Sequence, residues 1–149
     1  MTLPSGTVQG DAHEFPLRVY YEDTDAAGLV YYANYLKFAE RARTEMLRLL
    51  GFEHAALRRT TGGTFAVRHC SADYLAPAHL DDELVVSSRL LALGAASLEL
   101  DQRIQRGERE LVRLTVRLAY LRPDLRPTRL PAEMRTALAQ LSRPTRGGH

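Results

Sequence analysis

Hydrophobic residues at three- and four-residue spacing predict one long helix in the first third of the chain. The apolar positions, among them Phe38, Ala42 and Met46, alternate with charged positions from about residue 33 to residue 50. Gly51 follows directly and supplies a helix stop. This periodicity is typical of an amphipathic helix that buries one face.

Segments with strand character lie on both sides of this helix along the chain. One precedes it, at residues 15–21. The four that follow it, separated by turn residues, are predicted at residues 64–75, 83–93, 97–106 and 110–121. A short helical turn at residues 54–60 and a C-terminal helix at residues 131–141, which opens at a proline, complete the elements.

This order of elements predicts an α+β fold. Short connections between successive strands favour antiparallel pairing, and the one long helix is the natural cover for an apolar face of the sheet. An antiparallel sheet of about five strands wrapped around a central helix has the geometry called a hotdog. Because a lone sheet leaves open edges, we expect a homodimer, with a homotetramer as the alternative.

The 149 residues fit a single domain, which we expect to span residues 14–141. Residues 1–13 mix small and polar types without periodicity and are predicted to form a disordered arm. Residues 142–149 are predicted to form a disordered tail.

Composition excludes several classes of function. The net charge of +2, from 20 basic and 18 acidic residues, gives no support to nucleic-acid binding. Cys70 is the only cysteine, so an intrachain disulfide and a cysteine-based metal cluster are both ruled out. No apolar run reaches the roughly 18 residues that span a bilayer, and the N-terminal residues lack the apolar centre of a signal peptide. We therefore expect a cytoplasmic protein without a membrane span.

The junction between the first strand and the long helix carries the candidate chemistry. The helix begins near Tyr32, and a helix N-terminus presents unpaired N–H groups that stabilise negative charge on an oxygen. Asp25 lies seven residues upstream, with Gly28 between them to permit a tight turn. A carboxylate and an amide donor beside one carbonyl are the minimum equipment for acyl transfer to water. Spacing alone does not choose between Asp25, Asp23 and Glu22, and a turn or capping role is the alternative for each.

The segment Val19–Tyr35, VYYEDTDAAGLVYYANY, resembles the signature of the 4-hydroxybenzoyl-CoA thioesterase family, and is most similar to its Tol-Pal-associated acyl-CoA thioesterase branch. Residues 40–48, 73–78 and 94–98 are similar to the same branch, and the similarity covers residues 15–135. The resemblance implies a hotdog fold and hydrolysis of an acyl-CoA to free acid and CoA. The acyl group would be aromatic or short-to-medium aliphatic, and neither a cofactor nor a metal would be needed.

The resemblance also assigns roles to residues. The family's catalytic carboxylate is the second acid of an Asp-x-Asp pair, here Asp25, and its carbonyl-polarising amide corresponds to that of Tyr32. Gly28 and Tyr31 fall in the same motif and are assigned to substrate binding. Many Tol-Pal-associated members have histidine where this chain has Tyr32. The backbone N–H survives that change but an imidazole's acid–base contribution does not, so the acyl preference stays open.

Other residues are weaker candidates. Arg89 and the turn that ends at Ser97 are candidates for the CoA phosphates, because arginine makes bidentate contacts and a turn offers N–H groups. Glu40 and Glu45 on the long helix are the runner-up carboxylates, with ion pairing on the helix surface as the alternative. Cys70 is expected to be a small buried residue.

Two other functions compete with hydrolysis. A non-catalytic hotdog could bind an acyl-CoA or an acyl carrier protein as a sensor or scaffold. A dehydratase acting on β-hydroxyacyl thioesters needs a histidine and an acid at the site, and no histidine lies between His13 and His54. The five histidines show no metal-binding spacing. The expected partner is therefore an acyl-CoA, with an acyl carrier protein as the second candidate.

Overall fold

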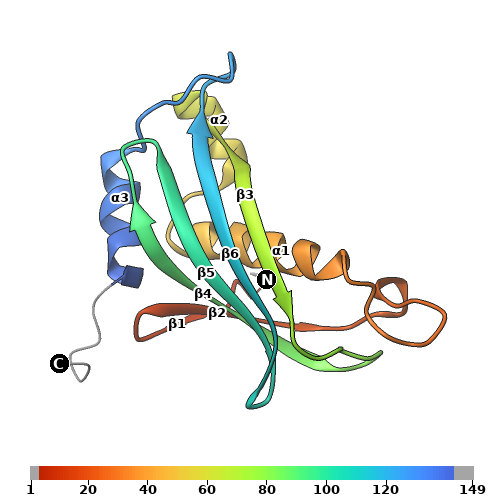
Figure 1. Ribbon diagram of the computed structural model, residues 1–149. Coiled ribbons are helices and arrows are strands. Elements are labelled where there is room, and N and C mark those ends of the chain that lie inside the picture. The colour runs from red at the N-terminus through yellow and green to blue at the C-terminus, as the bar shows by residue number, and fades with distance from the viewer. Residues whose placement is uncertain (1–3, 143–149) are drawn as a thin grey trace.

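An antiparallel sheet of six strands in the order β1-β2-β4-β5-β6-β3 forms the frame of the molecule (Figure 1). The computed structural model describes residues 4–142. The strands are β1 (Thr7–Gln9), β2 (Ala12–Arg18), β3 (Thr64–Tyr74), β4 (Glu83–Leu93), β5 (Ser97–Arg106) and β6 (Arg109–Leu121). The helices are α1 (Asn34–Leu49), α2 (His54–Thr61) and α3 (Ala132–Ala139), with short 3-10 turns η1 (Tyr21–Asp23) and η2 (Gln140–Ser142).

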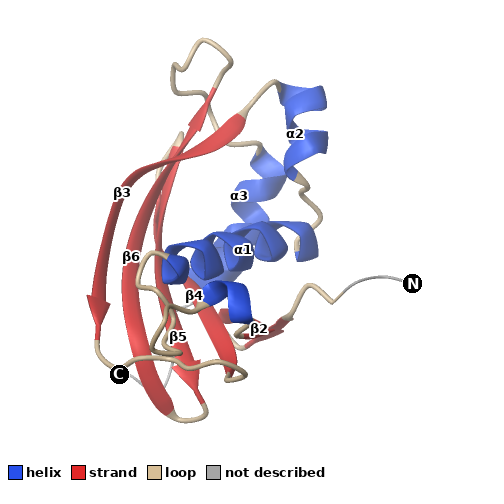
Figure 2. Cartoon of the chain, turned by 90° about the vertical axis from the view of Figure 1, so that its right-hand side faces the viewer, coloured by secondary structure: helices blue, strands red, loops and turns tan. Residues whose placement is uncertain are grey.

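Helix α1 lies against the inner side of the curved sheet, and Figure 2 shows α2 and α3 on that same side. The apolar face of α1 is buried, as its periodicity predicts: Tyr35, Phe38, Ala39, Ala42, Met46 and Leu47. In β6 the alternate positions Val112, Leu114, Val116, Leu118 and Tyr120 are buried as well. Burying a large apolar side chain contributes about 1.5–3 kcal/mol, so packing of the helix and the sheet around one core stabilises the fold. The predicted hotdog geometry is confirmed.

One buried polar contact fixes α1 on the sheet. The Gln102 amide nitrogen donates hydrogen bonds to the carbonyl of Ala39, at 3.1 Å, and to the Ser88 hydroxyl, at 3.0 Å. Arg43 Nη1 donates to the Gln102 amide oxygen at 2.9 Å. Because Gln102 is fully buried, these bonds offset the cost of removing its amide from water and specify where the helix sits.

The N-terminal arm is not disordered from Thr7 onward, so that part of the sequence prediction is wrong. Strand β1 pairs antiparallel with the start of β2, from Thr7 opposite Glu14 to Gln9 opposite Ala12. A three-residue strand whose side chains are all exposed has no hydrophobic periodicity to detect. It also makes the sheet six strands rather than five. Of the predicted tail, Ser142 ends η2, and residues 143–149 lie outside the described residues.

Pairing between successive strands is only partly as predicted. Strands β4, β5 and β6 pair in sequence order, but β3 pairs with β6 and β2 pairs with β4. Strand β3 therefore forms one edge of the sheet, and within residues 4–142 its outer side has no strand partner. No helix in that same range is long and apolar enough to cross a membrane.

Candidate active site

A tight loop between η1 and α1 holds Asp25. The N–H of Asp25 donates to the carbonyl of Leu29 at 2.8 Å, and the carbonyl of Asp25 accepts a hydrogen bond from the N–H of Gly28 at 3.0 Å. Gly28 has a φ of +80°, which L-residues with a side chain rarely adopt. Nothing lies within 4 Å of the place where a Cβ would sit, so the backbone angle, and not space, calls for glycine here.

The Asp25 carboxylate is held by one of its two oxygens. Oδ1 accepts hydrogen bonds from the N–H groups of Ala27, at 2.9 Å, and Leu29, at 3.2 Å. Oδ2 has no hydrogen-bond partner in the part of the chain that the structure describes, and the residue is exposed. The carboxylate is thus oriented by the loop while one oxygen stays available for chemistry.

Asp23 has a different position, although spacing alone made it equally eligible. Its Oδ2 accepts the N–H of Tyr20 at 2.8 Å. Its carbonyl accepts the N–H of Tyr31, at 3.1 Å, and the side-chain amide of Asn34, at 2.9 Å. The side-chain bond belongs to the capping box of η1, and the bond to Asn34 fastens the loop to the first residue of α1, so the contacts of Asp23 are structural.

The N–H groups of Tyr32 and Ala33 make no hydrogen bond within the described residues. The next amide, that of Asn34, donates to the carbonyl of Tyr31 at 2.8 Å and begins α1. The Tyr32 N–H is therefore an unpaired donor at the positive end of the helix dipole. Such a donor stabilises an oxygen that gains negative charge.

A cavity of about 500 Å³ brings Asp25 and Tyr32 together. Its lining residues are Asp25, Leu29, Val30, Tyr31, Tyr32, Tyr35, Tyr74, Leu75, Ala76 and Pro77. The Tyr74 ring lies edge-on to Tyr32, with centroids 6.1 Å apart, and 5.8 Å from the centroid of Tyr35. The walls are mostly aromatic and apolar, and Asp25 is the one acid among the lining residues.

The two runner-up carboxylates lie away from this cavity. Glu45 accepts hydrogen bonds from the Ser5 hydroxyl, at 2.8 Å, and from Arg48, at 2.7 Å, which indicates a structural role. Glu40 lines a separate cavity of about 300 Å³ that also includes Arg43 and His54. Burial lowers the pKa of His54, so this imidazole is neutral at pH 7.

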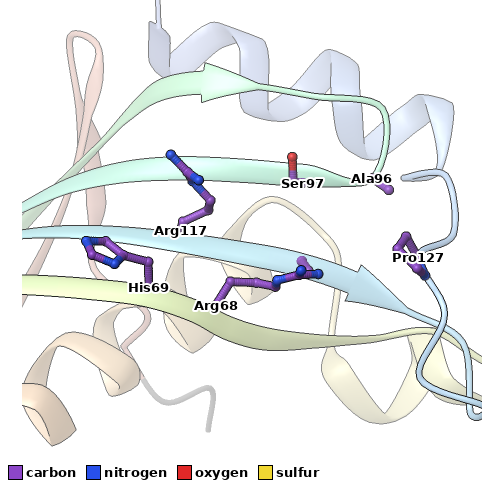
Figure 3. A pocket seen from close by; sticks show the side chains of 7 residues that line it. Arg68, His69, Ala96, Ser97, Arg117 and Pro127 are labelled. Carbon is purple, nitrogen blue, oxygen red and sulfur yellow. The ribbon is translucent and has the colours of Figure 1, made fainter.

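A larger cavity of about 630 Å³ lies on the outer side of the sheet, away from α1 (Figure 3). Arg68 and His69 of β3, Arg117 of β6 and Ser97 of β5 line it. Within residues 4–142 Arg68 makes no ion pair, and Arg117 lies 3.7 Å from Glu99. Two guanidinium groups beside an open groove suit an anionic ligand such as phosphate.

Arg89 does not line this groove. The structure therefore separates Arg89 from Ser97, although both were candidates for binding the CoA phosphates. Its Nε lies 2.9 Å from Asp11 Oδ1. In the sheet Arg89 is opposite Asp101 of β5, four residues from Ser97, which is about 13 Å along an extended strand. Arg89 and Ser97 lie apart because of the register between β4 and β5, which the sequence alone did not give.

Cys70 lies exposed on edge strand β3, contrary to the expectation that it is buried. The expectation came from its place in a strand, and an edge strand without a neighbour leaves its side chains accessible. In the described chain no group of three or more His, Cys, Asp or Glu side chains is close enough together to hold a metal ion.

Comparison with known proteins decides the family. Residues 27–113, which include Gly28, Tyr31 and Tyr32, match the family model described as the thioesterase superfamily. The chain belongs to the thioesterase superfamily. Relatives in it include the acyl-CoA thioesterase YbgC of Haemophilus influenzae, 41% identical over 128 residues that cover 85% of this chain and 94% of the relative. The acyl-CoA thioester hydrolase YbgC of Escherichia coli O6:H1 is 47% identical over 98 residues, covering 66% of this chain and 72% of the relative.

Solved thioesterase structures share the fold. The crystal structure of a probable thioesterase from Bartonella henselae superposes with a TM-score of 0.77 and 38% identity, covering 80% of this chain and 99% of that one. A 1,4-dihydroxy-2-naphthoyl-CoA thioesterase from Synechocystis has a TM-score of 0.81 and 26% identity, covering 89% of this chain and 99% of that one. The resemblance inferred from the sequence to a hotdog thioesterase is confirmed.

Some lining residues of this thioesterase were not identified from sequence. Tyr35 and Tyr74 form walls of the Asp25 cavity, and they lie on α1 and β3, far apart along the chain. Arg68 and Arg117 line the outer groove. The alternation in β6 does place Arg117 on the outer face, which is a usable signal. The grouping of residues from three strands needs the strand pairing, which the sequence leaves open.

Proposed function

We propose that this thioesterase hydrolyses an acyl-CoA at the Asp25 cavity and releases a free acid and CoA. One observation carries the proposal: a carboxylate with a free oxygen and an unpaired N–H at a helix N-terminus line one cavity. Relatives named acyl-CoA thioesterase and acyl-CoA thioester hydrolase, at 41% and 47% identity, support the substrate and do not favour a non-catalytic binding module.

In the proposed mechanism the thioester carbonyl oxygen accepts a hydrogen bond from the Tyr32 N–H, and the dipole of α1 strengthens it. Asp25 then acts in one of two ways. Its free oxygen attacks the carbonyl carbon and expels the thiolate, and water hydrolyses the resulting anhydride. Alternatively, Asp25 removes a proton from water that attacks the same carbon. A thiol pKa of about 8.5, by analogy with cysteine, makes the CoA thiolate an adequate leaving group without a strong acid.

The test is Asp25→Asn beside Asp23→Asn as the matched control. Both changes remove one carboxylate from the same loop, but only Asp25 lines the cavity. We expect kcat to fall by more than about 100-fold in Asp25→Asn and to stay within about fivefold of wild type in Asp23→Asn. Thiol release is measured on benzoyl, short-chain and long-chain CoA esters, which also determines the acyl preference. Near wild-type turnover by Asp25→Asn, or an equal loss in the control, would contradict the assignment.

The same proposal includes a homodimer made through β3. On β3, Arg68 and His69 line the outer groove, whereas Tyr74 lines the Asp25 cavity, five residues beyond His69 or about 17 Å along the strand. One protomer is thus poorly arranged to hold both ends of one substrate. Antiparallel pairing of two β3 edges about a two-fold axis would bring the Arg68 end of one strand beside the Tyr74 end of the other, with the groove on the outer face of the joined sheet and the Asp25 cavity on its inner face. We place the CoA phosphates in that groove, with Ser97, Arg68 and Arg117.

Single replacements of Arg68 and Arg117 by alanine test the groove. We expect each to raise KM for a CoA ester about tenfold with little change in kcat, because a charged hydrogen bond contributes about 1.5–3 kcal/mol. Hydrolysis of an N-acetylcysteamine thioester, which has no phosphate, should not change. The control is Arg113→Ala. Arg113 lies on the outer side of β6, as Arg117 does, but it is paired with Glu110. An acyl carrier protein thioester in the same assay tests the second candidate partner.

A further inference from the structure

Residues 77–82 are remote from Asp25 in sequence but run antiparallel to residues 28–30 of the loop between η1 and α1, residues 24–33, which holds Asp25 and is called the catalytic loop below. The Val30 N–H donates to the carbonyl of Ala78 at 2.9 Å, and the Leu80 N–H donates to the carbonyl of Gly28 at 3.2 Å. These two hydrogen bonds attach the second half of the catalytic loop to the 77–82 segment. The segment itself connects β3 to β4.

Leu29 joins this attachment to the catalytic carboxylate. It lies between the two hydrogen bonds and forms an antiparallel bridge with His79. Its own N–H donates to Asp25 Oδ1 at 3.2 Å, and its carbonyl accepts the N–H of Asp25 at 2.8 Å. A displacement of the 77–82 segment therefore moves Leu29, and with it both the backbone and the carboxylate of Asp25.

Arg106, at the end of β5, ties both ends of the 77–82 segment. Its Nη1 donates to Asp82 Oδ2 at 2.7 Å and to the carbonyl of Pro77 at 3.4 Å. Asp82 Oδ2 also accepts the N–H of His79 at 2.8 Å. Neither Arg106 nor Asp82 lines the Asp25 cavity, so their contacts act on the loop and not on a substrate.

The Tyr35 hydroxyl is a second side-chain anchor, beside the hydrogen bond that Arg18 Nη1 donates to the carbonyl of Asp81 at 3.5 Å. It accepts the N–H of Ala78 at 2.9 Å, and both residues are buried, with exposed fractions of 3% and 0%. Tyr35 belongs to the first turn of α1, three residues after Tyr32. The 77–82 segment is therefore bound both to the loop that holds the carboxylate and to the helix whose N-terminus presents the amide.

The charge state of Asp82 supports this arrangement at neutral pH. Burial raises the pKa of the Asp82 carboxyl, but the hydrogen bonds from the His79 N–H and from Arg106 outweigh it and hold the pKa below its ordinary value. The Asp82 carboxyl is thus ionised at neutral pH, which strengthens the hydrogen bond that it accepts from Arg106.

We propose that Arg106, Asp82 and Tyr35 are positioning residues for the hydrolysis. They hold the 77–82 segment and, through Leu29, keep the Asp25 carboxylate in place relative to the Tyr32 amide. This inference rests on the proposed function. A misplacement of about 1 Å at a reacting group can lower the rate on the order of 100-fold, so a distant pair can have a catalytic effect.

Kinetics on the full-length protein test the role. We expect Arg106→Gln and Asp82→Asn each to lower kcat about 10- to 100-fold with KM within about threefold, since neither side chain lines the cavity. The double variant should be no slower than the slower single variant, because both remove one contact. Arg106→Lys should recover part of the loss by restoring a charge. Tyr35→Phe, which removes one oxygen, should also lower kcat.

The control is Arg113→Gln. It breaks the Arg113–Glu110 pair, also at 2.7 Å and partly exposed, which does not touch residues 77–82. We expect kcat within about threefold of wild type in this control. Equal kcat in Arg106→Gln and Arg113→Gln would overturn the inference. So would a kcat of Arg106→Lys no higher than that of Arg106→Gln when the two variants have the same thermal stability.

Amide hydrogen exchange separates this inference from the proposed function. We expect the Leu29, Val30 and Leu80 amides to exchange at least tenfold faster in Arg106→Gln than in Arg113→Gln. Equal exchange in the two variants would overturn the inference even if the wild type is active. Conversely, a wild type that hydrolyses no ester removes the proposed function, while the exchange rates still report whether Arg106 holds the loop.

Discussion

Asp25 and Asp23 have the same side chain two residues apart, and their hydrogen bonds give them different roles. Asp23 accepts the N–H of Tyr20 and, through its carbonyl, fastens the loop to α1. The Asp25 carboxylate is held through Oδ1 alone, and the residue lines a cavity. The positive φ of Gly28 lets the chain turn back so that Leu29 reaches Asp25. At this scale the chemistry depends on backbone geometry as much as on residue type.

Gly28→Ala tests that dependence, with Gly107→Ala as its control. Both glycines have positive φ, +80° and +60°, and at neither does any atom lie within 4 Å of the place that an alanine Cβ would occupy. Each substitution should destabilise the protein by about 1 kcal/mol through backbone strain. Only Gly28→Ala should lower kcat, by about tenfold or more, because Gly107 lies in the β5–β6 turn. Urea denaturation and initial rates on one CoA ester measure both effects, and equal kcat losses would contradict the prediction.

The hairpin of β1 and β2 is fastened by a buried histidine. His13 is 0% exposed, and its Nε2 lies 2.7 Å from the carbonyl of Ser5. Its Nδ1 is buried without a partner among the described residues. Burial lowers the pKa of His13, and the hydrogen bond to Ser5 and the nearby Glu45 offset this only in part. The imidazole is therefore neutral in the folded hairpin.

This histidine makes stability depend on pH in a known direction. Its folded pKa is below its unfolded value of about 6.5, so the unfolded chain binds a proton that the folded chain does not. The contribution of neutral His13 to the free energy of unfolding is fully present above pH 6.5, and it is lost as the pH falls through 6.5 toward the folded pKa. We expect the urea midpoint to fall between pH 7.5 and 5.5, and to fall less in His13→Gln. Burial also lowers the pKa of His54, so His54 adds a pH dependence of the same sign, and this remains in His13→Gln.

The two edges of the sheet differ, which matters for the whole molecule. Strand β1 is three residues long, whereas β3 has eleven residues. A long unpaired edge is a template for another strand, and the exposed side chains beside it include Val67, Tyr74 and Leu75. The homodimer that we propose would pair at β3, which would set the Arg68 end of the strand in one copy beside the Tyr74 end in the other.

Val67→Arg tests the dimer, with Val8→Arg at the other edge as its control. The two valines are similarly exposed in one protomer, 50% and 44%, so either substitution should leave the protomer folded. A charge at Val67 would be buried by β3 pairing and should shift the protein to monomer, whereas Val8→Arg should not. Light scattering after gel filtration measures the mass. A dimer that survives Val67→Arg unchanged, or a monomeric wild type, would contradict dimerisation through β3.

The elements were predictable because their signals are local. The apolar periodicity of α1, the alternation in β6 and the turn residues between strands each depend on a few neighbouring positions. The boundaries of β4 and β5 were predicted to the residue, and those of α1 to within one. The Asp25 motif was also readable as a contiguous segment, and its resemblance to a thioesterase family indicated the chemistry. The strand β1 was missed because three exposed residues produce no pattern.

The tertiary structure decided everything that depends on which strands meet. The pairing of β3 with β6 rather than β4 creates the free edge, brings Tyr74 to Asp25 and sets Arg68 beside Arg117. It also decided that Arg106 reaches Asp82, in the segment that pairs with the loop holding Asp25. Backbone hydrogen bonds are chemically alike in every strand, so register and partner are chosen by the packing of the whole core and are not encoded in any one segment.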